Sequence, residues 1–219
     1  LNQAIWDVIE TNVRVPELVL GDLHAQTVAC HIGAREYQEM FSRYGADTMH
    51  FYIQELHNYA ESLARSEFSE IPDGTYEFTD HLDGLGENPE PIIFHVALKV
   101  TGDEVVVDWT GSSPQVSGGV NCSLPFTKAA SYTPLRSIMG SEVPNCHGYT
   151  RPITVIAPKG TVTNVVHPGA CGARGISGFR MIDCLFGALG KIVPEKVTAD
   201  GCGGSTLLTF SGYRDGKAF

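Results

Sequence analysis

Apolar side chains recur with a helical period over the first third of the chain. Residues 22–45 carry one apolar face that follows Asp22, a residue able to cap a helix, and Gly45 supplies a stop. A second stripe begins after Asp47 and keeps the 3.6-residue period through residue 63. The pattern predicts two helices that pack together as a hairpin. The second stripe consists of Met49, Tyr52, Ile53, Leu56, Tyr59, Ala60 and Leu63.

Two histidines share one face of the second predicted helix. His50 and His57 are seven residues apart, which is two turns and roughly 10 Å of rise. That spacing is too long for the pair to bind one metal ion without other ligands. We therefore expect both to be surface or boundary histidines.

The pattern changes to a two-residue alternation after residues 72–74, Pro-Asp-Gly. Tyr76 and Phe78 alternate with polar residues, which predicts a strand. Residues 93–100 and 104–109 alternate on either side of the turn Thr-Gly-Asp. This pattern predicts an antiparallel hairpin. Its first strand should bury Phe94, Val96, Leu98 and Val100 on one face.

The middle of the chain predicts one helix and a second pair of strands. Residues 127–139 have helical character, although Pro134 should kink or shorten the helix. Residues 151–156 and 162–166 flank the turn at 158–160, Pro-Lys-Gly, and so predict a strand pair.

The last third predicts a helix and a hairpin. Residues 179–193 follow a helical period, and Pro194 lies just past the end. Residues 207–214 are typical of a strand, and the following Asp215-Gly216 is a strong two-residue hairpin signal. The helix should bury Ile182, Leu185, Phe186 and Leu189.

The order of helices, strands, helix and strands predicts an α+β fold: an N-terminal helical hairpin, then a mostly antiparallel sheet with an added helix. We expect a helical segment at residues 1–70 and a β-rich α+β segment at 71–219, both parts of one larger domain. The chain starts with Leu rather than Met, and only three residues follow the Asp215-Gly216 turn. We therefore expect an internal fragment, cut at both ends.

Composition and charge narrow the classes of function. The 219 residues are 42% hydrophobic and 18% charged, which is typical of a globular domain. The formal net charge of -10 argues against binding to nucleic acid or an anionic membrane, and no apolar stretch is long enough to span a membrane. Six scattered cysteines form no C-x-x-C pair. We expect reduced thiols and a cytoplasmic location.

A polar, glycine-rich loop is the first candidate for chemistry. Residues 107–121, VDWTGSSPQVSGGVN, lead from an apolar strand into short polar side chains. Such a loop is too long for a tight turn, and loops on rigid scaffolds often carry sites. We take Ser112, Ser113, Gln115 and Asn121 as candidate substrate-binding residues. A solvated connection without a ligand is the alternative.

A second candidate follows the first predicted strand. Asp80, His81 and Asp83 could bind a metal ion, with His81 and Asp83 on the same face. An Asx-type turn before Gly84 is the alternative. In this segment we predict no metal site beyond the candidates His81 and Asp83.

Cys146, His147 and Arg151 combine a thiol, a base and a cation. Adjacent residues on an extended chain point in opposite directions, so a Cys146–His147 dyad conflicts with that geometry. A capped turn that leads into a strand is the alternative.

The last candidate lies before the final helix, where glycines accompany Arg174 and Arg180 in residues 169–180. Free N–H groups at a helix start and a nearby guanidinium can bind an anion. The alternative is that the glycines only permit a tight crossing. The chain has no Walker A, G-x-G-x-x-G, H-E-x-x-H or G-x-S-x-G motif, so ATP binding by this segment itself is unsupported.

These pieces together resemble the hydantoinase B/oxoprolinase family, the B-type subunits or C-terminal halves of ATP-dependent N-methylhydantoinases and 5-oxoprolinases. The resemblance spans nearly the whole chain. Its most specific part is the Thr-Gly-Ser-Ser-Pro-Gln-Val run with its downstream Asn. It rests on GDLHAQ at 21–26, RYG at 43–45, IPDGTY at 71–76, LDG at 82–84, the loop at 108–121, RPI at 151–153, APKGT at 157–161 and AR at 173–174.

The resemblance implies a hetero-oligomer in which an A-type ATPase subunit phosphorylates a cyclic amide carbonyl with ATP and the B-type subunit assists ring opening. It also implies a divalent metal in the complete protein, with ligands upstream of this segment. In this setting Asp83, His147 and Arg174 are candidate catalytic residues. Ser112, Ser113, Gln115, Asn121, Arg151, Arg174 and Arg180 are candidate substrate-binding residues.

Departures from the family pattern leave the substrate open. Leu85 stands where members often carry an acid, and Cys146 and His147 stand where an Asn and an acidic residue are common. A subunit of an acetone- or acetophenone-type carboxylase, which takes a ketone, is one alternative. A non-catalytic scaffold segment for the ATPase partner is the other.

Overall fold

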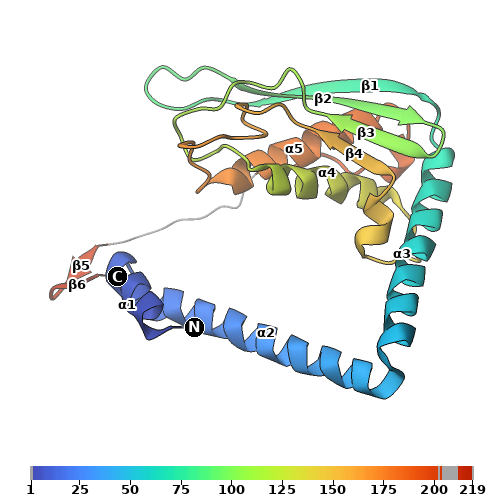
Figure 1. Cartoon of the computed structure of the whole chain (residues 1–219). Helices are drawn as coiled ribbons and strands as arrows, with labels where there is room; N and C mark the ends of the chain where they lie inside the picture. Colours follow the sequence, from blue (N-terminus) through green and yellow to red (C-terminus); the bar gives the residue numbers. More distant parts are fainter. Residues whose placement is uncertain (1, 202, 204–211, 219) are drawn as a thin grey trace. The chain divides into compact units, whose positions relative to one another are not determined.

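The computed structural model describes residues 2–201, 203 and 212–218. These residues form two compact units (Figure 1). The first unit comprises residues 2–53 and 212–218, and the second comprises residues 54–201 and 203. Each unit is described below by itself.

The first unit begins with a helix that periodicity did not predict. Helix α1 (Gln3–Asn12) starts at Asn2, whose side chain accepts a hydrogen bond of 3.0 Å from the backbone of Ala4. Helix α2 (Pro16–Tyr44) begins six residues before the predicted cap. Pro16 fits the first turn because its fixed φ suits a helix and its missing N–H would be unpaired there. Asp22 therefore lies inside the helix, whereas Gly45 ends it as predicted, at φ 81°.

Helix α3 (Ala46–Ser69) buries Met49 and Ala60 of the predicted stripe. Its buried positions near the end recur every four residues, at Ala60, Ala64 and Phe68. Tyr52 and Tyr59 of the predicted stripe are exposed. The packing of α2 against α3 as a hairpin stays a prediction.

A short hairpin follows in the sequence after residue 211. Strands β5 (Tyr213–Arg214) and β6 (Lys217–Ala218) pair in an antiparallel manner. The turn residues Asp215 and Gly216 have φ values of 54° and 76°, so both adopt the left-handed conformation that a two-residue turn requires. This confirms the turn prediction, while residues 207–211 of the predicted strand lie outside the described residues.

The second unit contains a four-stranded sheet in the order β1-β2-β3-β4. Strands β1 (Gly74–Leu82), β2 (Ile92–Thr101) and β3 (Glu104–Asp108) form an antiparallel meander. The predicted hairpin at residues 93–109 is thereby confirmed, and Gly102 makes its turn at φ 59°. The predicted face of β2, from Phe94 to Val100, is buried.

Strand β4 (Ile153–Ile156) corrects the second predicted strand pair. It pairs with β3 in parallel, whereas residues 162–166 form no strand with it. Instead, the backbone of Val162 bonds Ser113 and Cys122, with the Cys122 N to Val162 O distance at 2.7 Å. The backbone N–H and C=O of Val162, which a β4 hairpin partner would use, are therefore hydrogen-bonded to the long loop after β3. Local alternation could not reveal this non-local pairing.

Two helices cover one face of the sheet (Figure 1). Helix α4 (Leu124–Ile138) begins three residues before the predicted start and continues through Pro134, which is buried. Helix α5 (Arg174–Leu189) begins five residues before its predicted start and ends four residues before its predicted end. A 3-10 helix, η1 (His147–Thr150), lies between α4 and β4 in the sequence. A second 3-10 helix, η2 (Pro194–Lys196), follows α5.

The core lies between this sheet and the helices. Helix α5 approaches β1 closely, because a Cβ at Gly187 would lie 2.6 Å from the Phe78 ring. Leu185 and Leu189 are fully buried as predicted, whereas Ile182 and Phe186 are only partly buried. No helix in the described part of the chain is long and apolar enough to cross a membrane. Other fully buried large side chains are Trp109, Phe68, Phe94, Leu98, Leu135 and Met181.

Candidate functional site

The candidate loop is anchored where it leaves β3. Trp109 is fully buried, and its indole Nε1 donates a hydrogen bond of 2.9 Å to Ser131 Oγ on α4. Gly111 has φ 97°, and a Cβ there would lie 3.1 Å from the His95 ring. The Gly in Trp-Thr-Gly therefore permits a turn that a larger residue would strain.

Ser112 and Ser113 use their hydroxyls to continue the sheet. Ser112 Oγ accepts a hydrogen bond of 3.1 Å from the backbone of His95, and Ser113 Oγ accepts one of 2.9 Å from Ile93. The Ser113 N–H donates to Ile93 O at 2.9 Å. Strand β3 has ended at Asp108, so these serines pair with the part of β2 that β3 leaves uncovered.

Gln115 connects the loop to a distant segment. Its Oε1 accepts a hydrogen bond of 2.8 Å from the backbone of Val166, and its Nε2 donates one of 3.2 Å to the carbonyl of the same residue. The side-chain amide thus binds the Val166 backbone as a neighbouring strand would. Gln115 thereby fixes the two segments, 115–117 and 166–170, beside each other.

Asn121 is the most completely bonded polar side chain of the loop. It is fully buried. Its Oδ1 accepts from the backbone of Val116 at 2.8 Å, and its Nδ2 lies 2.9 Å from three carbonyl oxygens. These oxygens belong to Val116, Gly118 and Ala170. Asn121 therefore joins residues 116–118 of the loop to Ala170 in a distant segment.

Two shallow grooves flank the tip of this loop. One has a volume of about 340 Å³ and is lined by Gln115, Val116, Ser117, Pro168, Gly169 and Ala170. The other has a volume of about 310 Å³ and is lined by Leu85, Asn88, Glu90, Ile92, Val116 and Ser117. Each volume is at the lower end of the range for small-molecule sites. Of the four candidate loop residues, Gln115 lines the first groove directly.

Arg174 lies beside this loop at the start of α5. The Ala173 N–H donates to Gly119 O at 2.8 Å, which fixes the helix start against the loop. The exposed Arg174 donates to Cys171 O at 3.2 Å, and its guanidinium carbon lies 5.4 Å from the centre of the Phe126 ring. The bond to Cys171 uses one of the five N–H groups of the Arg174 guanidinium, so further N–H groups can donate to an anion.

The glycines before α5 also serve close packing. A Cβ at Gly178 would lie 2.7 Å from the Phe126 ring on α4. This observation favours the tight-crossing interpretation for Gly178. It leaves the helix start at Ala173 and Arg174 as the part of the segment that could meet a ligand.

Arg180 is surrounded by carboxylates. Its guanidinium lies 2.8 Å from Asp80, 3.1 Å from Asp183 and 3.6 Å from Asp200. Burial and the hydrogen bond with Asp200 raise the pKa of Asp183 to about 6. These acids line a cavity of about 230 Å³ together with Phe78 and Phe186. Arg180 is therefore paired with carboxylates of this chain, whereas Arg174 is exposed and bonded to a backbone carbonyl.

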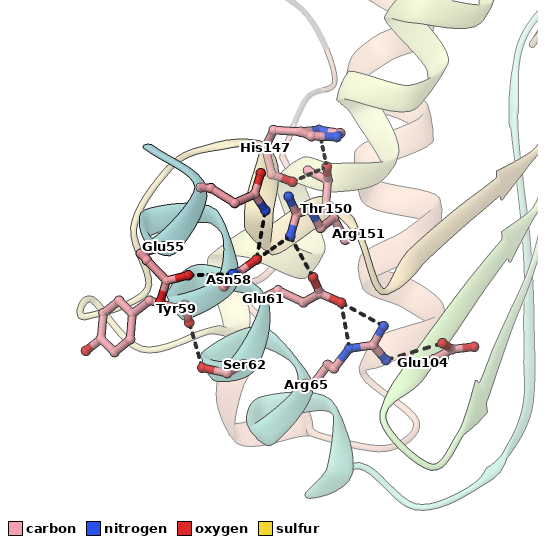
Figure 2. A network of polar contacts seen from close by, with 11 residues as sticks. Glu55, Asn58, Tyr59, Glu61, Ser62, Arg65, Glu104, His147, Thr150 and Arg151 are labelled. Carbon is pink, nitrogen blue, oxygen red and sulfur yellow. Dashed lines mark hydrogen bonds and ion pairs between the residues drawn. The ribbon is translucent and has the colours of Figure 1, made fainter. Parts of the chain in front are cut away.

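Arg151 and His147 belong to another part of the unit (Figure 2). Arg151 Nη1 lies 3.1 Å from Asn58 Oδ1 and 3.0 Å from Glu61 Oε2 on α3. Hydrogen bonds from Arg151 and Arg65 lower the pKa of Glu61. His147 Nδ1 lies 3.2 Å from the hydroxyl of Thr150. The structure therefore joins Arg151 to α3 and not to the candidate loop.

The segment around His81 and Asp83 has the features of a turn. Asp80 Oδ1 accepts a hydrogen bond of 2.8 Å from the backbone of His81. Gly84 has φ 111°, and a Cβ there would lie 2.3 Å from the carbonyl of Glu90. His81 and Asp83 are both exposed. In the described residues, no three or more His, Cys, Asp or Glu side chains form a group that could hold a metal ion.

The sequence predictions missed the acids that pair with the arginines. Asp183 lies three residues after Arg180 on α5, a spacing that places them on one helix face. That spacing could have indicated the pair. Glu61 and Arg65 likewise stand at i and i+4 on α3. Their partners from distant segments, Asp80 and Arg151, leave no local signal.

A mixed sheet with two helices on one face and an internally bonded loop beside α5 defines the class of protein as an α+β domain. The model of the hydantoinase B/oxoprolinase family matches residues 1–219. The chain belongs to this family.

Known relatives place the chain within larger proteins. It is 39% identical over 222 residues to a Pseudomonas sp. (strain NS671) protein named as the B component of a D-/L-hydantoinase, covering 96% of this chain and 37% of that protein. It is 29% identical over 201 residues to the beta chain of the Pseudomonas jessenii caprolactamase, covering 90% of this chain and 34% of that relative. The chain thus spans about a third of the length of these relatives.

Solved structures agree with this placement. The crystal structure of the ATP-dependent caprolactamase from Pseudomonas jessenii matches with a TM-score of 0.82 at 28% identity, covering 90% of this chain and 34% of that one. A nucleotide-free acetone carboxylase matches with a TM-score of 0.77 at 16% identity, covering 93% and 29%. The second likeness shows the fold alone.

Proposed function

We propose that this chain is part of the B-type subunit of an ATP-dependent cyclic-amide hydrolase. Such a subunit would assist the opening of a hydantoin, oxoproline or lactam ring after an A-type partner subunit has phosphorylated the ring carbonyl with ATP. The observation that carries the proposal is the family match over all 219 residues. The TM-score of 0.82 to an ATP-dependent caprolactamase supports it.

Within that subunit, the loop at residues 109–121 would form one wall of the substrate region. Gln115 lines the groove beside Ser117 and Gly169. The internal bonds of Ser112, Ser113 and Asn121 would hold the backbone of this wall rather than touch the substrate.

Arg174 would supply positive charge to the phosphorylated or anionic intermediate. Its side chain is exposed and lies at a helix start that is hydrogen-bonded to the loop. A helix start and a guanidinium both favour a negative charge. Arg180 is a weaker choice for this role, because three carboxylates already surround it.

We expect the divalent metal that the family resemblance implies to take its ligands from residues upstream of this segment. Among the described residues, no three His, Cys, Asp or Glu side chains form a group that could hold it. The proposal therefore uses no metal step in this part of the chain.

A cytoplasmic location remains part of the proposal. The five cysteines in the described part of the chain are free thiols, which agrees with a reducing compartment. Burial raises the pKa of Cys122 and of Cys184 to about 12, so both should stay protonated and unreactive at neutral pH.

The decisive test replaces Arg174 in the complete complex and measures ATP-coupled opening of hydantoin, 5-oxoproline and caprolactam. We expect Arg174→Ala to lower kcat/KM by roughly 10- to 100-fold, about 1.4–2.7 kcal/mol of transition-state stabilisation. The matched control is Lys159→Ala, which removes an exposed cation at a turn of the same unit. Equal losses in the two variants, or none in Arg174→Ala, would remove Arg174 from the mechanism.

The same assay separates the alternatives. Stimulation of ATP turnover by a ketone with bicarbonate, and not by cyclic amides, would identify a carboxylase subunit. Normal turnover after both Arg174→Ala and Gln115→Ala in an intact complex would identify this chain as a scaffold for the ATPase partner.

A further inference from the structure

Two histidines from distant parts of the sequence meet in the second unit. His57 lies on α3, and His147 is the first residue of η1. Their ring centres are 6.0 Å apart, and their ring planes make an angle of 80°. The spacing along α3 predicted that His57 would need ligands from elsewhere to bind a metal ion, and the fold supplies a second imidazole.

His57 has an unusual ring nitrogen. Its Nδ1 is buried and has no hydrogen-bond partner, and it is the only such side-chain nitrogen or oxygen in the described part of the chain. A buried polar atom without a partner carries a desolvation cost. Such atoms are rare in folded proteins, and a bound ion is one of the partners that explains them.

The hydroxyl of Thr150 orients the second ring. Thr150 Oγ1 donates a hydrogen bond of 2.9 Å to the carbonyl of His147. The same hydroxyl lies 3.2 Å from His147 Nδ1. Since its single proton is used on the carbonyl, the hydroxyl must accept from Nδ1–H. The Nε2 of a neutral His147 is then left without a proton, as a metal ligand requires.

The surroundings hold the two rings at a fixed separation. A Cβ at Gly148 would lie 2.2 Å from the carbonyl oxygen of His57, so η1 rests directly on α3. Arg151, one residue after η1, bonds Asn58 and Glu61 on the same helix (Figure 2). His147 is exposed, so an ion can enter from solvent.

We propose that His57 and His147 together bind one divalent transition-metal ion, of which Zn²⁺ is the expected type. An ion about 2.0–2.1 Å from one nitrogen of each imidazole places the two ring centres about 5–6 Å apart, which matches the observed pair. Imidazole nitrogens suit Zn²⁺, Cu²⁺ and Ni²⁺. No third such side chain of the described residues joins the group, so water completes the coordination. The ion bridges α3 and η1.

The test is calorimetric titration of the complete protein with Zn²⁺ in wild-type form and as His147→Ala, whose exposed site makes misfolding a small risk. We expect wild-type protein to take up one ion more per chain than His147→Ala, with at least a tenfold loss of affinity in Thr150→Val, because outer partners of a ligating histidine typically contribute 10- to 100-fold. The matched control is His31→Ala, which removes an exposed histidine from α2 and should titrate as wild type.

Electron paramagnetic resonance with Cu²⁺ counts the ligands directly. We expect the site lost in His147→Ala to show coupling to two imidazole nitrogens. Equal Zn²⁺ uptake by wild type and His147→Ala, or coupling to a single imidazole, would overturn the proposal. These readouts do not involve ring opening, so their outcome is independent of the proposed hydrolase function.

Discussion

The two units of this chain use apolar residues in different ways. Helix α5 buries seven of its sixteen residues against the sheet and α4. Helix α2 is almost twice as long, yet none of its residues is buried in the described part of the chain. Leu18, Val28 and Ile32 of α2 are all largely exposed.

The difference teaches that a helical period predicts a helix more reliably than it predicts burial. Helix α5 gains its stability from the removal of apolar surface from water. Helix α2 relies more on local terms, namely a proline at its start, a glycine at its end and exposed ion pairs such as Arg35 with Glu39, beside its contacts with α1. Relatives of the chain are about three times longer. Four experiments test this comparison.

Matched leucines give the largest expected contrast. Leu185 is fully buried on α5, whereas Leu18 is 69% exposed on α2. We expect Leu185→Ala to lower the free energy of unfolding by about 2–5 kcal/mol and Leu18→Ala by no more than about 0.5 kcal/mol. Urea denaturation of each variant measures both values. A comparable loss in the two variants would show that α2 contributes to a packed core.

Matched asparagines compare a loop with a helix end. Asn121 is fully buried and bonds four backbone groups, whereas Asn12 is exposed and donates to Val8 O within α1. We expect Asn121→Ala to cost about 2–4 kcal/mol, because it removes the shared partner of the Val116 N–H and of the Val116, Gly118 and Ala170 carbonyls. Asn12→Ala should change stability by less than about 0.5 kcal/mol. Hydrogen exchange at residues 116–118 and 170 should accelerate only in Asn121→Ala, and unchanged protection there would contradict the assigned role.

A pair of aspartates, one in each unit, tests how the stability of the chain depends on pH. Because the pKa of Asp183 is raised to about 6, the folded chain binds more protons than the unfolded chain between about pH 4 and pH 6. The contribution of Asp183 to the free energy of unfolding is therefore greatest below pH 4 and falls as the pH rises through 6. We expect Asp183→Asn to be about 1 kcal/mol more stable than wild type at pH 8, with no gain at pH 4.

The control for this pH experiment is Asp22→Asn on α2, an exposed acid. It should show no such difference between pH 4 and pH 8. Thermal unfolding at both pH values measures the effect. A gain for Asp183→Asn that is independent of pH would remove proton binding as its cause.

Matched ion pairs give the smallest contrast. Arg151 and Glu61 are about one quarter exposed and lie 3.0 Å apart, whereas Arg35 and Glu39 are about two thirds exposed and lie 4.0 Å apart. A double-mutant cycle should give about 0.5–1 kcal/mol for the first pair. The second pair should give no measurable coupling. Equal coupling in both cycles would mean that partial burial does not strengthen the pair.

Much of the second unit could be predicted from local pattern. The alternation at residues 93–109 identified the β2–β3 hairpin and its buried face, because a strand with one face in the core must alternate. In the first unit, Asp215-Gly216 identified the turn between β5 and β6 for the same kind of local reason. The family resemblance on the TGSSPQV run of the loop also held over the whole chain.

Prediction failed where pairing is non-local. Residues 162–166 alternate like a strand, yet the backbone of Val162 is hydrogen-bonded to Ser113 and Cys122 of the long loop after β3. Strand β4 pairs with β3 in parallel and not with residues 162–166. The sequence predicts the start of α5 five residues late, since the glycines before it resemble a loop. Polar loop residues such as Asn121 looked available for a ligand, and only the fold shows that backbone groups occupy them.

The sequence by itself determined the helices other than α1, the central hairpin, the family and the acidic character of this protein, because each depends on residue type, period or a local motif. The tertiary structure alone decided that three acids surround Arg180, that Gln115 binds the backbone of Val166, and that His57 meets His147. The physical reason is that these contacts join residues as many as 100 positions apart along the chain. Their energies depend on distance and burial in space, which no local pattern of side chains encodes.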